Sequence, residues 1–440
     1  MKKIKKTLSM QRKAESLVPG VTQLLSKRPD RFSDGTWPGY YSKAKGAVVW
    51  DLDGNEYLDM SIGGIGATVL GYADEDVDKA VVAAIGNGVA SSLNCPGEPE
   101  LADRLCQLHP WADMARFGKC GGEAMAMAVR IARASTGRDV VAFCGYHGWH
   151  DWYLAANVGG ADSLNGHLMS GLEPLGVPRN LKGSAFPFRF NRLDELERII
   201  SAHGDDLAAI VMEPLRNEEP QEDFIRGVRA LADKTGATMI LDEISAGFRY
   251  CTGGAHLVKH PVTPDMAVFS KALGNGYAVS AVIGIERVMK AAGETFMSST
   301  NWTEAVGYAA ALATLKKHER CDVATHLVRL GGRVQDGWAE LGAKHGVPVN
   351  VGGMEAMSHF SIECDDFPAV KAYFIQSLLE EGILASNLCY MMYAHTDAHV
   401  DRYLEACDRG FEKVARAIEA GNVESLLKGR PAVAGFKRLS

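Results

Sequence analysis

The sequence predicts an α/β fold in which a mostly parallel, mixed sheet is flanked by helices, together with a smaller α+β domain. Short apolar runs alternate with helical stretches in the middle of the 440-residue chain, whereas its last third is mainly helical. Strands that are apolar along their whole length are typical of parallel sheets that helices cover on both faces. A composition that is 47% hydrophobic and 23% charged suits a globular protein long enough for two domains.

The predicted elements follow one another in a regular order. AVVWDLDGNEYLD (47–59) alternates around Asp53-Gly54, which indicates a hairpin. The buried strands are expected at DVVAFC (139–144), LAAIVME (207–213), ATMILDE (237–243) and DMAVFS (265–270). The helices are expected at EAMAMAVRIARAS (123–135), at RGVRALADKTG (226–236) and in long stretches after residue 303. We therefore expect an N-terminal segment (1–59) that packs with the small domain, a large domain (60–305) and a C-terminal small domain (306–440).

The composition indicates which kind of partner and which cellular compartment to expect. A formal net charge of -7 and the lack of a basic stripe argue against nucleic acid. The nine cysteines are odd in number and contain no C-x-x-C pair, which indicates a reducing compartment. No signal-peptide core and no apolar run of membrane-spanning length is present, so we expect a cytoplasmic protein with no membrane contact.

Polar residues stand at the carboxyl ends of three predicted strands. Glu213 follows LAAIVM, Asp242 and Glu243 follow ATMIL, and Lys271 follows DMAVFS. The carboxyl ends of parallel strands meet over one crevice, so these residues are expected to share a site. A plain ion pair between an acid and the lysine is the competing interpretation, because buried charges are usually paired.

A glycine-rich segment precedes the first long helix. In FGKCGGEAMAM, Gly121 and Gly122 open that helix, and the free N–H groups of a helix start bind phosphate, although a simple tight turn would look the same. Further along, GYHGWHDWY (145–153) supplies aromatic side chains with His147 and His150. These histidines match no standard zinc spacing, so we expect a polar loop and no metal.

A phosphate cradle, a strand-end acid, an aromatic face and a strand-end lysine are together the parts that hold pyridoxal 5'-phosphate. Its aldehyde takes a lysine as a Schiff base, its ring nitrogen needs a carboxylate, and its ring needs a stacking surface. On these motifs the sequence resembles the class III pyridoxal-phosphate aminotransferases of fold type I, in the branch similar to glutamate-1-semialdehyde aminomutase. The resemblance runs from about residue 20 to 420 and includes the spacing from LDEISAGFR to FSKALGNGY.

The resemblance implies a role for individual residues. Lys271 would form the Schiff base, Asp242 would pair with the ring nitrogen, and Ile244 would lie under the ring. Cofactor contacts are also implied for Gly121, Gly122, Tyr146, Glu213 and Thr300. Gly121-Gly122 replace a Gly-Thr or Gly-Ser pair of the family, so one hydroxyl contact is missing. Thr300 matches a threonine that the neighbouring subunit donates, which implies a homodimer.

The implied function is transfer of an amino group from an amino acid donor to a keto or aldehyde acceptor of a biosynthetic pathway. The alternatives are glutamate-1-semialdehyde 2,1-aminomutase and, more remotely, a non-catalytic protein that keeps the fold. Relative to the aminomutase, a Ser-Trp-Gly-Pro segment is replaced by Gly64-Ile65-Gly66-Ala67 and an acid by Asn387, which favours transfer between molecules. The candidate substrate residues are Arg28, Arg216 and Asn387.

Overall fold

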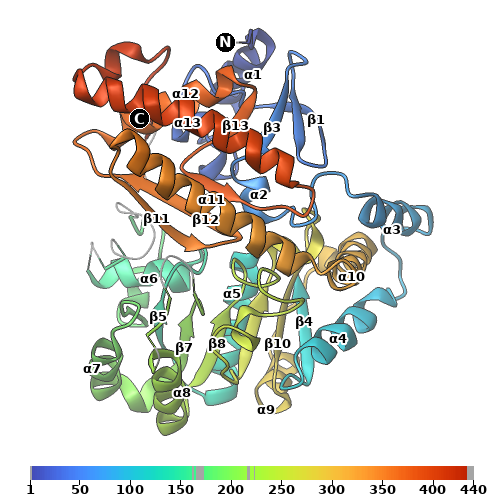
Figure 1. Cartoon of the computed structure of the whole chain (residues 1–440). Helices are drawn as coiled ribbons and strands as arrows, with labels where there is room; N and C mark the ends of the chain where they lie inside the picture. Colours follow the sequence, from blue (N-terminus) through green and yellow to red (C-terminus); the bar gives the residue numbers. More distant parts are fainter. Residues whose placement is uncertain (1, 161–162, 165–172, 216–218, 222, 434–440) are drawn as a thin grey trace. The chain divides into compact units, whose positions relative to one another are not determined.

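The computed structural model describes residues 2–160, 163–164, 173–215, 219–221 and 223–433 (Figure 1). The chain divides into two units, one formed by residues 75–325 and the other by residues 1–74 together with 326–440. Residues 60–74 thus group with the unit that contains both termini. Residues 306–320 group with the central unit, because α10 (Ala305–Arg320) packs against α3 (Glu75–Gly86) and α4 (Gly97–Leu108). The sequence-based boundaries were 59/60 and 305/306.

The central unit is built around a seven-stranded mixed sheet with the order β4-β10-β9-β8-β7-β5-β6. Its five strands from β9 to β6 are parallel, and β10 runs antiparallel to both β9 and β4. The strands are β4 (Met114–Gly118), β5 (Val140–Cys144), β6 (Ala185–Pro187), β7 (Leu207–Met212), β8 (Thr238–Asp242), β9 (Met266–Phe269) and β10 (Ser280–Gly284). The predicted mostly parallel sheet and its four apolar strands are therefore confirmed.

Helices cover the sheet, which explains why its strands are apolar throughout. Alternate strand residues, such as Val141, Val211 and Val268, join the buried cluster formed with α5 (Gly121–Thr136). The residues between them, such as Ile210 and Leu241, are also 0% exposed. Because successive strand side chains point to opposite faces, both faces of the sheet are buried. The remaining helices of this unit are α6 (Asp151–Gly159), α7 (Leu193–His203), α8 (Phe224–Thr235), which packs against β7 and β8, and α9 (Glu286–Met289).

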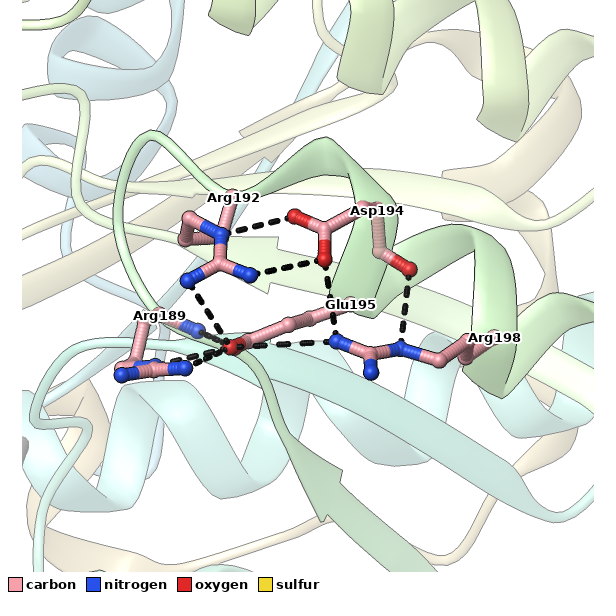
Figure 2. A network of polar contacts seen from close by, with 5 residues as sticks. All are labelled: Arg189, Arg192, Asp194, Glu195 and Arg198. Carbon is pink, nitrogen blue, oxygen red and sulfur yellow. Dashed lines mark hydrogen bonds and ion pairs between the residues drawn. The ribbon is translucent and has the colours of Figure 1, made fainter.

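The start of α7 carries an exposed network of ion pairs (Figure 2). Glu195 contacts Arg189, Arg192 and Arg198, and Asp194 contacts the last two as well. The two acids lie in the first turn of α7, where a negative charge interacts favourably with the positive end of the helix dipole. Exposed pairs of this kind add little stability, and nothing in the geometry assigns this network a chemical role.

The unit with the two termini holds two smaller sheets. One has the order β1-β2-β3-β13 and the other the order β11-β12-β14. Their strands are β1 (Tyr41–Lys45), β2 (Val48–Asp51), β3 (Glu56–Met60), β11 (Val349–Met354), β12 (Met357–Ile362), β13 (Ile383–Ala385) and β14 (Leu388–Tyr390). The predicted hairpin is confirmed, since β2 and β3 are antiparallel around Gly54, which has a φ of 85°. The parallel pairing of β13 with β3 joins the N-terminal and C-terminal segments.

Among the described residues, four α-helices belong wholly to this unit, and a fifth enters it. They are α1 (Lys5–Leu17), α2 (Gly63–Gly66), α12 (Phe367–Glu380) and α13 (Asp397–Glu419), and α11 (Val323–His345) runs in from the central unit. In α2 the φ angles of the four residues are 44°, 63°, 64° and 71°, so this single turn is left-handed. Its non-glycine residue, Ile65, is strained by roughly 1–2 kcal/mol in that conformation. None of the helices in the described part of the chain has the length and hydropathy of a membrane span.

Two neighbouring glycines of α11 give a matched test of packing. A Cβ at Gly331 would lie 1.8 Å from the carbonyl oxygen of Glu355, whereas one at Gly332 would meet nothing within 4 Å. We predict that Gly331→Ala lowers the free energy of unfolding by about 1–3 kcal/mol or more through overpacking. Gly332→Ala should instead raise it by up to about 1 kcal/mol, because alanine favours a helix. Urea and thermal unfolding measure both, and equal effects would contradict the packing of α11 on residue 355.

Candidate active site

The carboxyl ends of β5, β7, β8 and β9 form one edge of the parallel sheet. The ladder continues just past the strands, with Glu213 N donating to Cys144 O at 3.3 Å and Glu243 N donating to Val268 O at 2.9 Å. The ends of β5 and β7, and likewise the ends of β8 and β9, therefore lie at the same level along the sheet. The residues at or just beyond these ends are Tyr146, Glu213, Asp242 and Lys271.

Asp242 ends β8 with its carboxylate enclosed, since the residue is only 3% exposed. Its Oδ1 accepts the backbone N–H of Ile244 at 3.0 Å. Its Oδ2 lies 2.8 Å from Nδ1 of His147, on the turn after β5. Both oxygens thus have a donor, and the plane of the carboxylate is set by contacts from two separate segments.

Lys271 follows β9 and reaches toward the loop after Asp242. Its Nζ donates a hydrogen bond to Oγ of Ser245 at 2.6 Å. Its backbone has a φ of 39°, which is uncommon for a residue with a side chain and costs roughly 1–3 kcal/mol. The next residues, Ala272 and Leu273, are buried and hold this conformation in place. An amine nitrogen, a hydroxyl and a strand-end carboxylate are thereby gathered at adjoining strand ends.

The start of α5 is shaped to accept an anion. Oε2 of Glu123 accepts the N–H groups of Lys119 at 2.7 Å and Cys120 at 3.3 Å. The N–H groups of Gly121 and Gly122 come next in the first turn, where a helix has no internal partner for them. Burial and then the Glu123 carboxylate raise the pKa of the Cys120 thiol, so this residue adds no negative charge.

Gly121, at the helix start, and Gly148, on the turn after β5, have steric reasons to be glycine. A Cβ at Gly121 would lie 2.8 Å from Cδ1 of Ile244. A Cβ at Gly148 would lie 2.8 Å from Cα of Gly122, so the two backbones approach closely. The helix start, the apolar Ile244 side chain and the turn after β5 therefore form one continuous lining.

Glu213 braces the turn that carries Tyr146. Its Oε2 accepts the backbone N–H of Tyr146 at 3.3 Å, and a Cβ at Gly145, whose φ is 115°, would lie 2.6 Å from the same oxygen. The Tyr146 ring is partly buried against the α5 core cluster and lies edge-on to Tyr153, with ring centroids 5.7 Å apart. The described contacts of Glu213 thus orient the aromatic side chain.

Thr300 is exposed, in the short turn Thr300–Thr303. This turn is tied to the start of α5, because Nε1 of Trp302 donates to Oε1 of Glu123 at 2.9 Å. Lys119 also forms an ion pair with Glu304, which caps α10. The turn is therefore anchored on the inside while its threonine faces outward.

The structure describes two of the three candidate substrate residues. Arg28, in the unit with the termini, is 6% exposed and forms an ion pair with Asp30. In the same unit, Nδ2 of Asn387 donates to Phe360 O at 3.1 Å, while its buried Oδ1 has no hydrogen-bond partner among the described residues. Arg216 lies outside the described residues.

Two residues of the site were not predicted from the sequence. His147 was expected in a polar loop, but its ring contacts Asp242 and Cys144 O. Ser245 was not singled out, although it stands three residues after Asp242 and one after Ile244. Position after a strand-end acid was the available signal for Ser245, whereas His147 is 95 residues from Asp242 and needed the fold.

Comparison with known proteins agrees with this geometry. The model of the class-III aminotransferase family matches residues 33–411. The 3-aminobutyryl-CoA aminotransferase of Cloacimonas acidaminovorans is 31% identical over 429 residues, which cover 94% of this chain and 99% of the relative. The 2'-deamino-2'-hydroxyneamine transaminase of Streptomyces kanamyceticus is 33% identical over 403 residues, which cover 90% and 96%. Glutamate-1-semialdehyde 2,1-aminomutases are also among the relatives, at 30% identity.

Solved structures share the fold over nearly the whole chain. The pyridoxal-phosphate form of the FumI protein of Sphingopyxis sp. MTA144 superposes with a TM-score of 0.83 at 25% identity, covering 97% of this chain and 98% of that one. The expected resemblance is confirmed, and the chain belongs to the class-III aminotransferase family.

Proposed function

We propose that the chain is a pyridoxal-phosphate-dependent aminotransferase that moves an amino group from an amino acid donor to a keto or aldehyde acceptor. The observation that carries this proposal is the pairing of Lys271 Nζ with Ser245 Oγ at 2.6 Å, three residues from the enclosed Asp242 carboxylate. Family membership supports the same reaction class. The intact lysine, acid and glycine turn argue against a non-catalytic protein.

The donor set of the site fits this cofactor. Bound pyridoxal phosphate supplies an aldehyde for the amine and a ring that accepts electrons from the substrate carbon. The N–H groups of Gly121 and Gly122 and the positive end of α5 would bind its phosphate. The carboxylate of Asp242 would pair with its ring nitrogen. Ile244 offers an apolar surface to the ring, and Tyr146 an aromatic one.

Lys271 moves the proton in the reaction. With the cofactor bound, its Nζ would take the proton from the substrate carbon that bears the amino group and deliver it two atoms away, to the former aldehyde carbon of the cofactor. The hydroxyl of Ser245 accepts a hydrogen bond from this nitrogen, so it orients the amine. The strained backbone at residue 271 fixes the base of the lysine side chain.

Two replacements favour transfer between molecules over the internal transfer of an aminomutase. In the left-handed turn Gly63–Gly66, the smaller side chain of Ile65 stands where the aminomutase has a tryptophan. Asn387 replaces a carboxylate, and its free Oδ1 is a neutral acceptor. Both changes suit a larger and more polar acceptor. Relatives named for 3-aminobutyryl-CoA and for 2'-deamino-2'-hydroxyneamine support an acceptor of that kind.

The working assembly is a homodimer in which Thr300 contacts the cofactor phosphate of the neighbouring subunit. The outward position of Thr300 on an anchored turn supports this arrangement. It would supply the hydroxyl that Gly121-Gly122 lack. We further infer a cytoplasmic location, which the nine free cysteines support.

Lys271→Ala should abolish covalent cofactor attachment and slow turnover by about 10²–10⁴-fold, because the amine moves the proton. Borohydride reduction of the wild-type enzyme should fix the cofactor to the peptide that contains Lys271. Lys290→Ala, at an exposed lysine that pairs with Glu286, is the control and should label normally. A label on another lysine would overturn the assignment.

Asp242→Asn should leave the cofactor bound but nearly inert. The amide keeps the size of the side chain and an oxygen for the Ile244 N–H, but it lacks the charge that holds the ring-nitrogen proton. Single-turnover spectra with an amino donor measure the half-reaction directly. Half-reaction rates equal to those of the wild type would end this interpretation of Asp242.

The purified enzyme should show ping-pong kinetics and release a 2-oxo acid from its amino donor. A panel of acceptors that includes CoA thioesters and aminoglycoside ketones tests the acceptor class, while glutamate-1-semialdehyde should be a poor substrate. If the enzyme converts that semialdehyde to 5-aminolevulinate at a normal rate, on the order of one per second, the aminomutase assignment is correct.

A further inference from the structure

His150 lies against the start of α5, the helix whose free N–H groups we assign to the cofactor phosphate. A Cβ at Gly122 would lie 3.4 Å from Cδ2 of His150 and 3.7 Å from its Nε2. The edge of the imidazole ring that bears Nε2 therefore faces the α-carbon of Gly122. Because glycine has no side chain, no side chain of residue 122 separates the ring from the helix start.

The ring of His150 makes no hydrogen bond within the described part of the chain. His150 is the N-cap residue of α6, yet its side chain does not cap that helix, and neither ring nitrogen has a partner among the described residues. The residue is partly buried. An imidazole carries at least one N–H group, and polar groups shielded from water usually have a partner. A ligand at the helix start would provide one.

Packing holds the ring of His150 in place. The indole of Trp149 stacks on it, with ring centroids 4.4 Å apart and planes inclined by 24°. The turn that carries both residues is pressed against α5, since a Cβ at Gly148 would lie 2.8 Å from Cα of Gly122. The imidazole is thus placed beside the helix start before a ligand arrives, which reduces the entropy cost of binding.

We propose that His150 is a cofactor-binding residue whose ring N–H donates to the phosphate held by the N–H groups of Gly121 and Gly122. The imidazole would take the place of a polar side chain at position 122. Hydrogen bonds to an ionised phosphate are roughly twice as strong as those between neutral groups. This inference rests on the proposed function, and it adds a donor from the same subunit to the hydroxyl assigned to Thr300 of the partner subunit.

His150→Phe tests this role, because the variant keeps a ring to stack on Trp149 but has no donor. We expect it to weaken binding of pyridoxal 5'-phosphate by about tenfold or more, since a hydrogen bond to a charged group is lost. Binding of pyridoxal, which has the same aldehyde for Lys271 but lacks the phosphate, should change by less than about twofold. Absorbance titrations of the full-length apoenzyme measure both affinities.

His203→Ala is the matched control. His203 is also partly buried and stacks on an aromatic ring, that of Phe186 at 4.3 Å, but it ends α7 just before the amino end of β7. The control should change neither affinity. Equal losses of both ligands in His150→Phe would show a purely structural role and overturn the proposal, and so would an unchanged affinity for the phosphorylated form.

Gly122→Ser tests whether residues 122 and 150 serve the same place. A Cβ at this position would make only ordinary contacts, the shortest being 3.4 Å. In a His150→Ala background, Gly122→Ser should restore most of the affinity for pyridoxal 5'-phosphate, because the new hydroxyl is a donor at the same helix start. A double variant that binds this ligand no better than His150→Ala contradicts the proposal.

Nitrogen NMR of the wild-type enzyme with labelled histidine does not depend on how the variants fold. The ring signal that is missing from His150→Phe should shift on addition of pyridoxal 5'-phosphate, and much less on addition of pyridoxal. Equal shifts, or none, would overturn the proposal. Failure of the wild-type enzyme to bind either compound at Lys271 would instead reject the proposed function.

Discussion

The parallel register of β8 between β7 and β9 is the constraint on which the site depends. Leu241 pairs with Met212 on one side, and Asp242 pairs with Val268 on the other. A slip of one residue would turn every side chain of the strand to the opposite face. Because both faces of this sheet are buried, such a slip would move Asp242 and break the packing at once. The same apolar burial that stabilises the sheet therefore fixes the height and direction of the strand-end residues.

Two of the eight non-glycine residues with a positive φ in the described part of the chain are ones to which we assign chemistry or specificity. Lys271 has a φ of 39°, and Ile65 in the other unit has a φ of 64°. Such conformations persist only where the surrounding structure holds them. At Lys271 the hold comes from the fully buried strand β9 before it and from Ala272 and Leu273 after it. The buried sheet thus holds the strained backbone at Lys271 in place, and this fixes the position of the reactive side chain.

The strands could be predicted because burial on both faces of a sheet leaves an unbroken apolar run in the sequence. The glycine turn could be predicted because a helix start that lies close to other backbone needs glycine. Short or edge elements such as β6, with three residues, carry no such signal. The contact of His147 with Asp242 could not be predicted, since only strand order brings the two segments together. The sequence could not decide whether Arg28 binds substrate or pairs within the protein. A buried guanidinium needs a partner in either case, and Asp30, two residues away, provides one.

The two consecutive acids at the end of β8 each contact an enclosed histidine. Glu243 Oε1 lies 2.6 Å from Nδ1 of His256, a contact much like that of Asp242 with His147. The second nitrogen of His256 accepts the indole N–H of Trp111 at 3.1 Å, whereas the second nitrogen of His147 faces the carbonyl oxygen of Cys144. Backbone N–H groups of residues 255 and 256 supply the other donors to Glu243. Asp242, the acid assigned to the ring nitrogen, thus contacts one histidine ring and one backbone N–H group, whereas Glu243 contacts one histidine ring and two backbone N–H groups in the interior.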